Sequence, residues 1–192
     1  MSNTSPAELL QRLQKLAVET GALQYGDFTL SSGAKSTFYF DGKRLTYHPE
    51  GAAIVGQLVF EALRDAGVEA VGGLTMGADP IAVAVAVTSQ LRGKPLAAFS
   101  VRKEVKGHGT SKAIEGALPE RPAQVAVVED VITTGASANQ AIKAVEERGH
   151  RVTMVVAIVD RGPGGSAALR ERGYRFTALL RLDDQGRLHP YA

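Results

Sequence analysis

The chain has 192 residues, of which 44% are hydrophobic and 22% are charged, and its formal net charge is +2. This length is enough for one well-packed α/β domain and short for two. The charge is too small to indicate a nucleic acid or a membrane surface as partner. The absence of cysteine excludes disulfides, thiolate metal sites and a thiol nucleophile. The N-terminus lacks a signal-peptide pattern and no apolar run is long enough to span a bilayer, so we expect a cytoplasmic protein.

The first part of the chain predicts a helix and then a small β-hairpin. Ser5-Pro6-Ala7-Glu8 is a capping box with proline at the first helical position, and apolar residues recur at helical spacing up to Gly21. Residues 28–33 and 36–41 have the pattern of two short strands around a glycine turn, and they are rich in phenylalanine and tyrosine. Such side chains either stack on a flat heterocycle or form a minor core, and composition does not separate the two.

The rest of the chain alternates between helical and strand patterns. Helices are predicted at 49–66, at 80–91, from 137 to a stop at Gly149, and up to about 172. Strands are predicted at 68–74, 95–101, 125–128, 152–159 and 174–180. This alternation predicts an α/β fold with a mostly parallel central sheet flanked by helices. The helix at 80–91 lacks a wide polar face, which indicates burial between the sheet and a neighbour such as a second subunit.

Residues 125–137 carry the strongest chemical pattern. A short apolar strand is followed by Glu129 and Asp130, then by hydroxyl residues and Gly135, and then by a helix. The amides and positive dipole end of a helix N-terminus favour a phosphate, and no Gly-Lys-Ser/Thr of an ATP-binding loop is present. Adjacent carboxylates just past a strand suit sugar hydroxyls or bound Mg²⁺. The alternative is a solvated strand end with an ordinary helix cap.

Residues 102–112 form a polar, glycine-rich loop. Arg102, Lys103, Lys106 and Lys112 oppose Glu104 and Glu115 up to residue 116, an excess of +2 that equals the formal charge of the whole chain. The loop is either a solvated connection or a flap that closes over a polyphosphate, with His108 as a proton or hydrogen-bond donor. Long loops inside a compact domain are uncommon unless they are functional, which favours the flap.

These motifs resemble a known enzyme family. Glu129 to Ser137 resembles the phosphoribosyl diphosphate (PRPP) signature of the type I phosphoribosyltransferases. The loop Arg102-Lys103-x-x-Lys106-Gly-His108-Gly, and the segment from Phe28 through Asp41, resemble the orotate phosphoribosyltransferases in particular. The resemblance covers nearly the whole chain. It implies the type I phosphoribosyltransferase fold as a single domain over 1–192, with a small N-terminal hood at about 1–45 and a core at about 46–192.

The resemblance also implies roles for individual residues. The PRPP-binding positions are Thr75, Met76, Gly77, Glu129, Asp130, Val131, Ile132, Thr133, Thr134, Gly135, Ala136 and Ser137. The orotate-binding positions are Tyr39, Phe40, Thr133 and Arg161, of which Arg161 meets the orotate carboxylate. The catalytic positions are Arg102, Lys103, Lys106 and His108, which contact pyrophosphate and, in the family's dimer, reach into the neighbouring subunit's site.

The implied reaction transfers the 5-phosphoribosyl group from PRPP to orotate, giving orotidine 5-monophosphate and pyrophosphate in pyrimidine (UMP) biosynthesis. The resemblance implies Mg²⁺ as cofactor, held mainly by substrate oxygens, with no certain protein ligand. It also implies a homodimer that shares the loop across its interface, and neither nucleic acid nor membrane as partner. Two alternatives remain: a type I transferase for a purine base, and a PRPP-sensing regulator that binds nucleic acid, which would need a basic face outside the active site.

Two positions depart from the pattern of some family members. Those family members have a lysine at the position of Ser31 and a Tyr-Lys pair at the positions of Met76 and Gly77. Pyrophosphate contacts in this turn must then come from backbone amides and Thr75. Lys35 and Lys43 are candidates for the missing charge, and the sequence does not choose between them.

Overall fold

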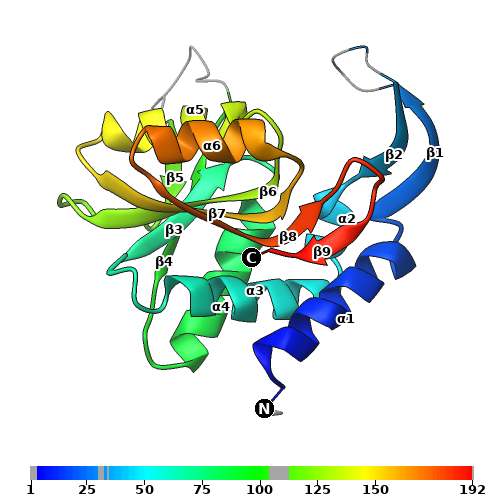
Figure 1. Cartoon of the computed structure of the whole chain (residues 1–192). Coiled ribbons are helices and arrows are strands. Elements are labelled where there is room, and N and C mark those ends of the chain that lie inside the picture. The colour runs from blue at the N-terminus through cyan, green and yellow to red at the C-terminus, as the bar shows by residue number, and fades with distance from the viewer. Residues whose placement is uncertain (1–3, 30–32, 34, 104–112, 192) are drawn as a thin grey trace.

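A seven-stranded sheet forms the centre of the computed structural model, which describes residues 4–29, 33, 35–103 and 113–191 (Figure 1). Its strand order is β5-β4-β3-β6-β7-β8-β9, with the inner pairs parallel and the two outermost pairs antiparallel. The strands are β3 (Ala70–Leu74), β4 (Ala97–Val101), β5 (Ile114–Gly116), β6 (Gln124–Ile132), β7 (Arg151–Asp160), β8 (Arg175–Leu182) and β9 (Leu188–Pro190). The predicted mostly parallel sheet is confirmed.

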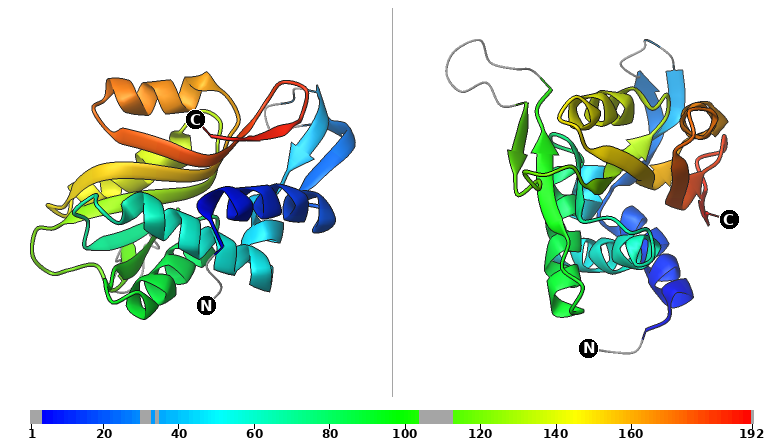
Figure 2. Two further views of the ribbon diagram at one scale, coloured as in Figure 1. Left: turned by 60° about the horizontal axis from the view of Figure 1, so that its bottom comes forward. Right: turned by 90° about the vertical axis from the view of Figure 1, so that its left-hand side faces the viewer.

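Helices cover both faces of this sheet, as the two views of Figure 2 show. One layer consists of α5 (Ala136–Glu146) and α6 (Pro163–Glu171). The other consists of α1 (Pro6–Glu19), α3 (Pro49–Leu63) and α4 (Asp79–Leu91). None of the helices in the described part of the chain combines the length and apolar character needed to cross a bilayer, and the cytoplasmic location stays a prediction.

The central strand β6 contributes to a separate core on each face. Val125 and Val127 belong to the cluster that includes the buried face of α5, whereas Ala126 and Val128 belong to the cluster that includes α3 and α4. Successive side chains of a strand point to opposite faces, so a strand covered on both sides must be apolar at every position. This explains why residues 125–128 show no polar alternation.

The hood, at about residues 1–45, contains α1 together with β1 (Leu23–Thr29), β2 (Lys35–Phe40) and the short helix α2 (Gly42–Thr46). The predicted hairpin is present, but its first strand begins at Leu23 rather than at residue 28. Leu13, Leu16 and Phe40 are buried in the same cluster as residues of α3 and α4. The division into hood and core at about residue 45 therefore stays a prediction, because this apolar core is continuous across it.

The structure corrects several element boundaries. The pattern missed α2, β5 and β9, which are three to five residues long and too short to show periodicity. It also ended the central strand at residue 128, whereas β6 continues to Ile132 and contains the acid pair. The cause is the partner strand, because β7 pairs with β6 as far as Ile132, opposite Asp160. Glu129 and Asp130 thus lie within the end of the strand and not beyond it.

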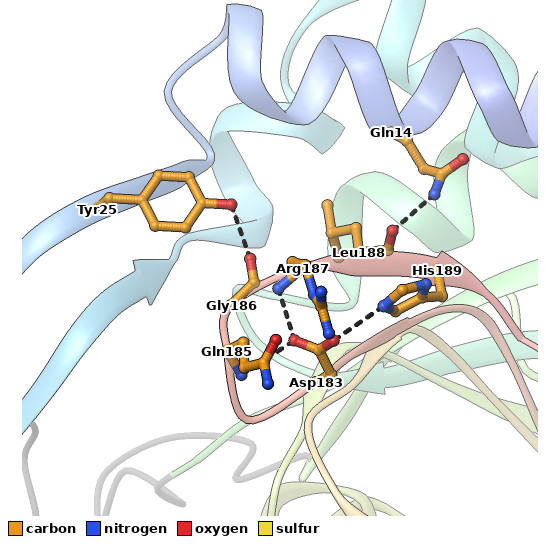
Figure 3. A network of polar contacts seen from close by, with 8 residues as sticks. All are labelled: Gln14, Tyr25, Asp183, Gln185, Gly186, Arg187, Leu188 and His189. Atoms are coloured by element: carbon orange, nitrogen blue, oxygen red, sulfur yellow. Dashed lines mark hydrogen bonds and ion pairs between the residues drawn. The ribbon is translucent and has the colours of Figure 1, made fainter.

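The C-terminal hairpin β8–β9 is fastened to the hood (Figure 3). The Tyr25 hydroxyl donates to the Gly186 carbonyl at 2.8 Å, and the Gln14 amide donates to the Leu188 carbonyl at 2.8 Å. Within the turn, Asp183 accepts from the amides of Gln185 and Arg187 and from the side chains of Arg187 and His189. The Arg187 amide, and then His189, hold the pKa of Asp183 well below its ordinary value of 3.8.

Asp183→Ala should lower the melting temperature at neutral pH, because the hairpin turn loses the acceptor of four hydrogen bonds. A carboxyl whose pKa is lowered by folding stabilises the protein above its unfolded pKa, and this contribution is lost as pH falls through the folded pKa. The difference in melting temperature from the unchanged protein should therefore shrink below about pH 4. Asp184→Ala, which removes an exposed carboxylate of the same turn, is the control. A constant difference at all pH values would contradict the role of Asp183.

Candidate active site

The turn between β6 and α5 encloses a small polar cavity. Gly135 stands just before α5 with φ 76° and ψ 10°, in the left-handed region, and lets the chain turn from the strand into the helix. The cavity has a volume of about 150 Å³ and is lined by Glu129 and by every residue from Val131 to Ala138. The first amides of α5 have no acceptor within the helix and lie at its positive end. The cavity therefore has the donors that a phosphate group requires.

Gly165, at the start of α6, supports this turn from behind. Its amide donates to the Thr133 carbonyl at 3.0 Å. A Cβ at position 165 would lie 2.8 Å from that carbonyl oxygen and 2.9 Å from the amide nitrogen of Gly135, so only glycine fits. Sequence reasoning assigned no role to Gly165. The Gly-Pro-Gly-Gly run at 162–165 was the available signal, since glycine at a helix start permits close backbone contact.

A second cavity, of about 250 Å³, adjoins the first and shares Glu129, Val131 and Ser137 with it. It lies between the turn that follows β3 and the end of β6, where two neighbouring parallel strands end at the same edge of the sheet. Its lining residues are Lys43, Leu74, Thr75, Met76, Gly77, Lys103, Glu129, Asp130, Val131 and Ser137. All twelve residues predicted to bind PRPP line one or both cavities.

The turn after β3 is fixed by contacts with β4. The Thr75 amide donates to the Val101 carbonyl at 2.8 Å, and the Ser100 hydroxyl donates to Asp79 at 2.7 Å. These bonds hold the turn beside the point where the cationic segment leaves β4.

Of the four predicted catalytic residues, the structure brings one to the cavities. Lys103 lines the second cavity, and its carbonyl accepts a hydrogen bond from Gln140 of α5 at 2.9 Å. Arg102 instead pairs with Glu115 of β5 at 2.8 Å and lines neither cavity. Lys106 and His108 lie outside the described residues.

The residues predicted to bind orotate are placed less closely together. Thr133 lines the first cavity. The Arg161 amide donates at 2.8 Å to the carbonyl of Ile132, the residue that precedes Thr133. Tyr39 is 39% exposed and lies beside Phe28, whereas the Phe40 side chain is 4% exposed and belongs to the core. A contact from Phe40 to a base would therefore have to come from its backbone.

Phe38 connects the hood to Arg161. The Arg161 guanidinium lies over the Phe38 ring, 5.4 Å from its centre. This cation–π contact positions the guanidinium, whose own in-plane N–H groups match the geometry of a planar anion. The aromatic richness of the hairpin was the sequence signal, but it did not distinguish Phe38 from its neighbours.

Glu129 is the more deeply buried member of the acid pair. Glu129 is 6% exposed, and its Oε2 has no hydrogen-bond partner among the described residues. Burial, and then the neighbouring Asp130, raise the pKa of Glu129 to about 8. Asp130 accepts from the Val131 amide at 2.9 Å. Because an uncompensated buried carboxylate is costly, Glu129 holds a proton at neutral pH until a ligand supplies donors or positive charge.

The two carboxylates of the acid pair are also candidate ligands for a metal ion. The described residues contain no group of three or more histidine, cysteine, aspartate or glutamate side chains that could hold a metal ion. Two carboxylates, one of them with an unpaired buried oxygen, do supply the hard oxygen ligands that Mg²⁺ prefers. This donor set fits Mg²⁺ bound jointly with substrate oxygens.

Several proteins of similar sequence are named orotate phosphoribosyltransferase. The orotate phosphoribosyltransferase of Thermosynechococcus vestitus is 48% identical over 180 residues, which cover 94% of each chain. That of Aquifex aeolicus is 42% identical over 182 residues, which cover 92% of this chain and 98% of the relative. The chain belongs to the orotate phosphoribosyltransferase family. No protein-family model matches it.

Solved structures of orotate phosphoribosyltransferases agree. The Mycobacterium tuberculosis enzyme in complex with Fe(III) dicitrate has a TM-score of 0.77 and 39% identity, covering 92% of this chain and 96% of that one. The same organism's enzyme in complex with PRPP has a TM-score of 0.71 and 34% identity, covering 95% and 92%. Saccharomyces cerevisiae adenine phosphoribosyltransferase, at 18% identity and a TM-score of 0.64, shares the fold alone. The type I phosphoribosyltransferase fold is confirmed, and the purine and regulatory alternatives are not favoured.

In this orotate phosphoribosyltransferase family member, Glu129→Gln should change how stability depends on pH. The folded protein binds a proton at Glu129 that the unfolded chain releases near 4.5, so the unfolding free energy should fall as pH rises from 4.5 to about 8. The slope due to this group is at most about 1.4 kcal/mol per pH unit. Urea unfolding at about pH 5, 7 and 9 should show a gain in stability of Glu129→Gln over the unchanged protein that grows with pH. Glu120→Gln, at an exposed position, should run parallel to the unchanged protein. A parallel profile for Glu129→Gln as well would contradict the raised pKa.

Proposed function

We propose that the protein transfers the 5-phosphoribosyl group of PRPP to orotate, giving orotidine 5-monophosphate and pyrophosphate. The observation that carries this proposal is the pair of adjoining cavities at one edge of the sheet, one with phosphate donors and the other with an acid pair and cations. The family membership of the chain supports orotate as the acceptor. The similarity to a solved relative in complex with PRPP supports the donor.

In this proposal each part of PRPP has its own contacts. The 5-phosphate binds the amides at the start of α5 and the hydroxyls of Thr133, Thr134 and Ser137. The ribose hydroxyls bind Glu129 and Asp130. The diphosphate lies in the second cavity, at the turn of Thr75, Met76 and Gly77 and beside Lys103.

The base is proposed to bind where the hood meets the end of β7. Arg161, held over Phe38, pairs with the orotate carboxylate, since guanidinium and carboxylate form parallel charge-assisted hydrogen bonds. Thr133, one residue beyond the partner of the Arg161 amide, touches both substrates. Tyr39 and the Phe40 backbone complete the proposed base contacts.

No protein nucleophile is needed for this reaction. Pyrophosphate leaves C1 of the ribose as the orotate ring nitrogen arrives, so that the C1–O bond breaks as the C1–N bond forms. The proton of that ring nitrogen passes to the departing pyrophosphate. The two cavities align the reactants, and Lys103, together with Arg102, Lys106 and His108, neutralises the departing charge. Glu129 and Asp130, together with substrate oxygens, would hold Mg²⁺, which would supply further positive charge to the leaving group.

The protein is further proposed to act as a homodimer through α4. Val83, Val87 and Leu91 recur every fourth residue along this helix and are 58%, 56% and 64% exposed. Val87 and Leu91 border a largely apolar hollow of about 390 Å³ between α3 and α4. Apolar side chains lined up in this way on a surface helix favour a protein partner, and a second copy would meet the predicted need to bury residues 80–91.

The proposed reaction is tested by mixing the protein with Mg²⁺, PRPP and orotate and following the loss of orotate's ultraviolet absorbance. We expect turnover with orotate and none with adenine, guanine or uracil. Turnover with a purine base, or none with orotate, would overturn the proposal.

The assay also tests Arg161. Arg161→Ala should raise the KM for orotate by about tenfold or more, the equivalent of losing a charge-assisted hydrogen bond, and leave the KM for PRPP nearly unchanged. Arg148→Ala, at an exposed position of the chain, should change neither constant. Equal losses for orotate and PRPP in Arg161→Ala would count against a contact with the carboxylate.

For the dimer, Val87→Glu should yield a monomer in size-exclusion chromatography with light scattering, because it places a charge within the apolar face of α4. Val18→Glu, at a valine of α1 that is 57% exposed, should leave the dimer intact. A monomer in the unchanged protein, or a dimer of unchanged stability in Val87→Glu, would refute this interface.

A further inference from the structure

The short helix α2 brings a cation from the hood to the second cavity. Lys43 lines this cavity together with Lys103 and with the turn of Thr75, Met76 and Gly77. Lys35, the other candidate for the missing charge, lies at the far end of the β1–β2 pairing and donates to the Thr29 hydroxyl at 2.7 Å. Lys35 does not line the cavity. The structure thus distinguishes two lysines that the sequence left equivalent.

Lys43 is held in place by Asp41, the residue that caps α2. The Asp41 carboxylate accepts from the Lys43 backbone amide at 3.1 Å and pairs with its Nζ at 2.7 Å. The Asp41 hydrogen bond is the largest cause that raises the pKa of Lys43, and the charges of Asp41, Asp130 and Tyr39 act in the same direction. Lys43 is therefore cationic at any physiological pH. With its side chain 43% exposed, its ammonium group can also reach a ligand in the cavity.

Gly77 and Gly42 explain why the positive charge reaches the cavity from the hood. A Cβ at Gly77 would lie 2.6 Å from Oδ1 of Asp130, and a Cβ at Gly42 would lie 2.7 Å from the Cβ of Asp130. The turn after β3 and the start of α2 therefore both touch Asp130. Any side chain at position 77 would press on this carboxylate, whereas Lys43 follows Gly42 directly and approaches from the hood.

The charge balance of the cavity requires such a cation. Asp130 lines it beside the buried Glu129, which gives up its proton only when positive charge is supplied, and a diphosphate next to carboxylates is repelled unless positive groups intervene. Among the described residues that line the cavity, Lys43 and Lys103 are the positive ones. We propose that Lys43 binds the diphosphate group of PRPP and stabilises it as it leaves as pyrophosphate. This inference rests on the proposed function and adds a hood residue to the site.

The test compares two ligands that share parts of PRPP. Calorimetry with pyrophosphate and Mg²⁺ should show an affinity about 10- to 100-fold lower for Lys43→Gln than for the unchanged protein, as expected for a lost charge-assisted contact. The affinity for ribose 5-phosphate, which has no diphosphate, should change less than about twofold. In steady-state kinetics the KM for PRPP should rise while the KM for orotate stays the same. Lys43→Arg, which keeps the charge, should restore most of the pyrophosphate affinity.

Arg44→Gln is the matched control. Arg44 is the next cation along α2, but it lines a different hollow, with Arg12 and Glu19 of α1. Its loss should leave both ligand affinities unchanged. The melting temperature of each variant establishes that it is folded.

Two outcomes would overturn the role of Lys43. One is an unchanged pyrophosphate affinity in folded Lys43→Gln, and the other is an equal loss of ribose 5-phosphate affinity, which would indicate a structural effect on the hood. Neither outcome would contradict the proposed function, which is contradicted separately if the unchanged protein transfers no phosphoribosyl group to orotate. In that case a selective loss of pyrophosphate affinity in Lys43→Gln would still support a diphosphate-binding lysine.

Discussion

Carboxylates and phosphates must share one edge of the sheet if PRPP binds as proposed, and their repulsion is the constraint on which the rest of the site depends. Glu129 and Asp130 are adjacent residues at the end of β6, and both cavities include at least one of them. Burial reduces the conflict in the ligand-free protein, because Glu129 keeps a proton near neutral pH. Binding of a polyanion then requires positive groups close by.

Those positive groups come from three separate parts of the chain. The start of α5 offers backbone amides and its dipole, the end of β4 leads to Lys103, and α2 of the hood contributes Lys43. Each is anchored: Gly165 backs the turn before α5, Gln140 binds the Lys103 carbonyl, and Asp41 holds Lys43. Anchored donors are effective for stabilising a leaving group because little reorganisation is needed when charge develops.

The hood depends on contacts from the opposite end of the chain. Tyr25 and Gln14 bind the C-terminal hairpin, and the turn of that hairpin is organised around Asp183. The same hood carries Phe38, beneath the Arg161 guanidinium, and Lys43. The C-terminal strands thus help to set the position of groups that are proposed to touch both substrates.

The sequence by itself determined the order of the longer helices and strands, the mostly parallel sheet and the strand-to-helix turn that is proposed to bind phosphate. These features follow from local rules: unbroken apolar runs, helical spacing, and glycine and hydroxyl residues at a strand-to-helix turn. Only the tertiary structure decided that the acid pair lies inside β6, that Glu129 is buried, and that Lys43 rather than Lys35 reaches the cavity. It also separated Lys103, at the cavity, from Arg102, paired with Glu115. Burial, pairing and direction depend on segments far apart in the chain, and no local pattern encodes where those segments meet.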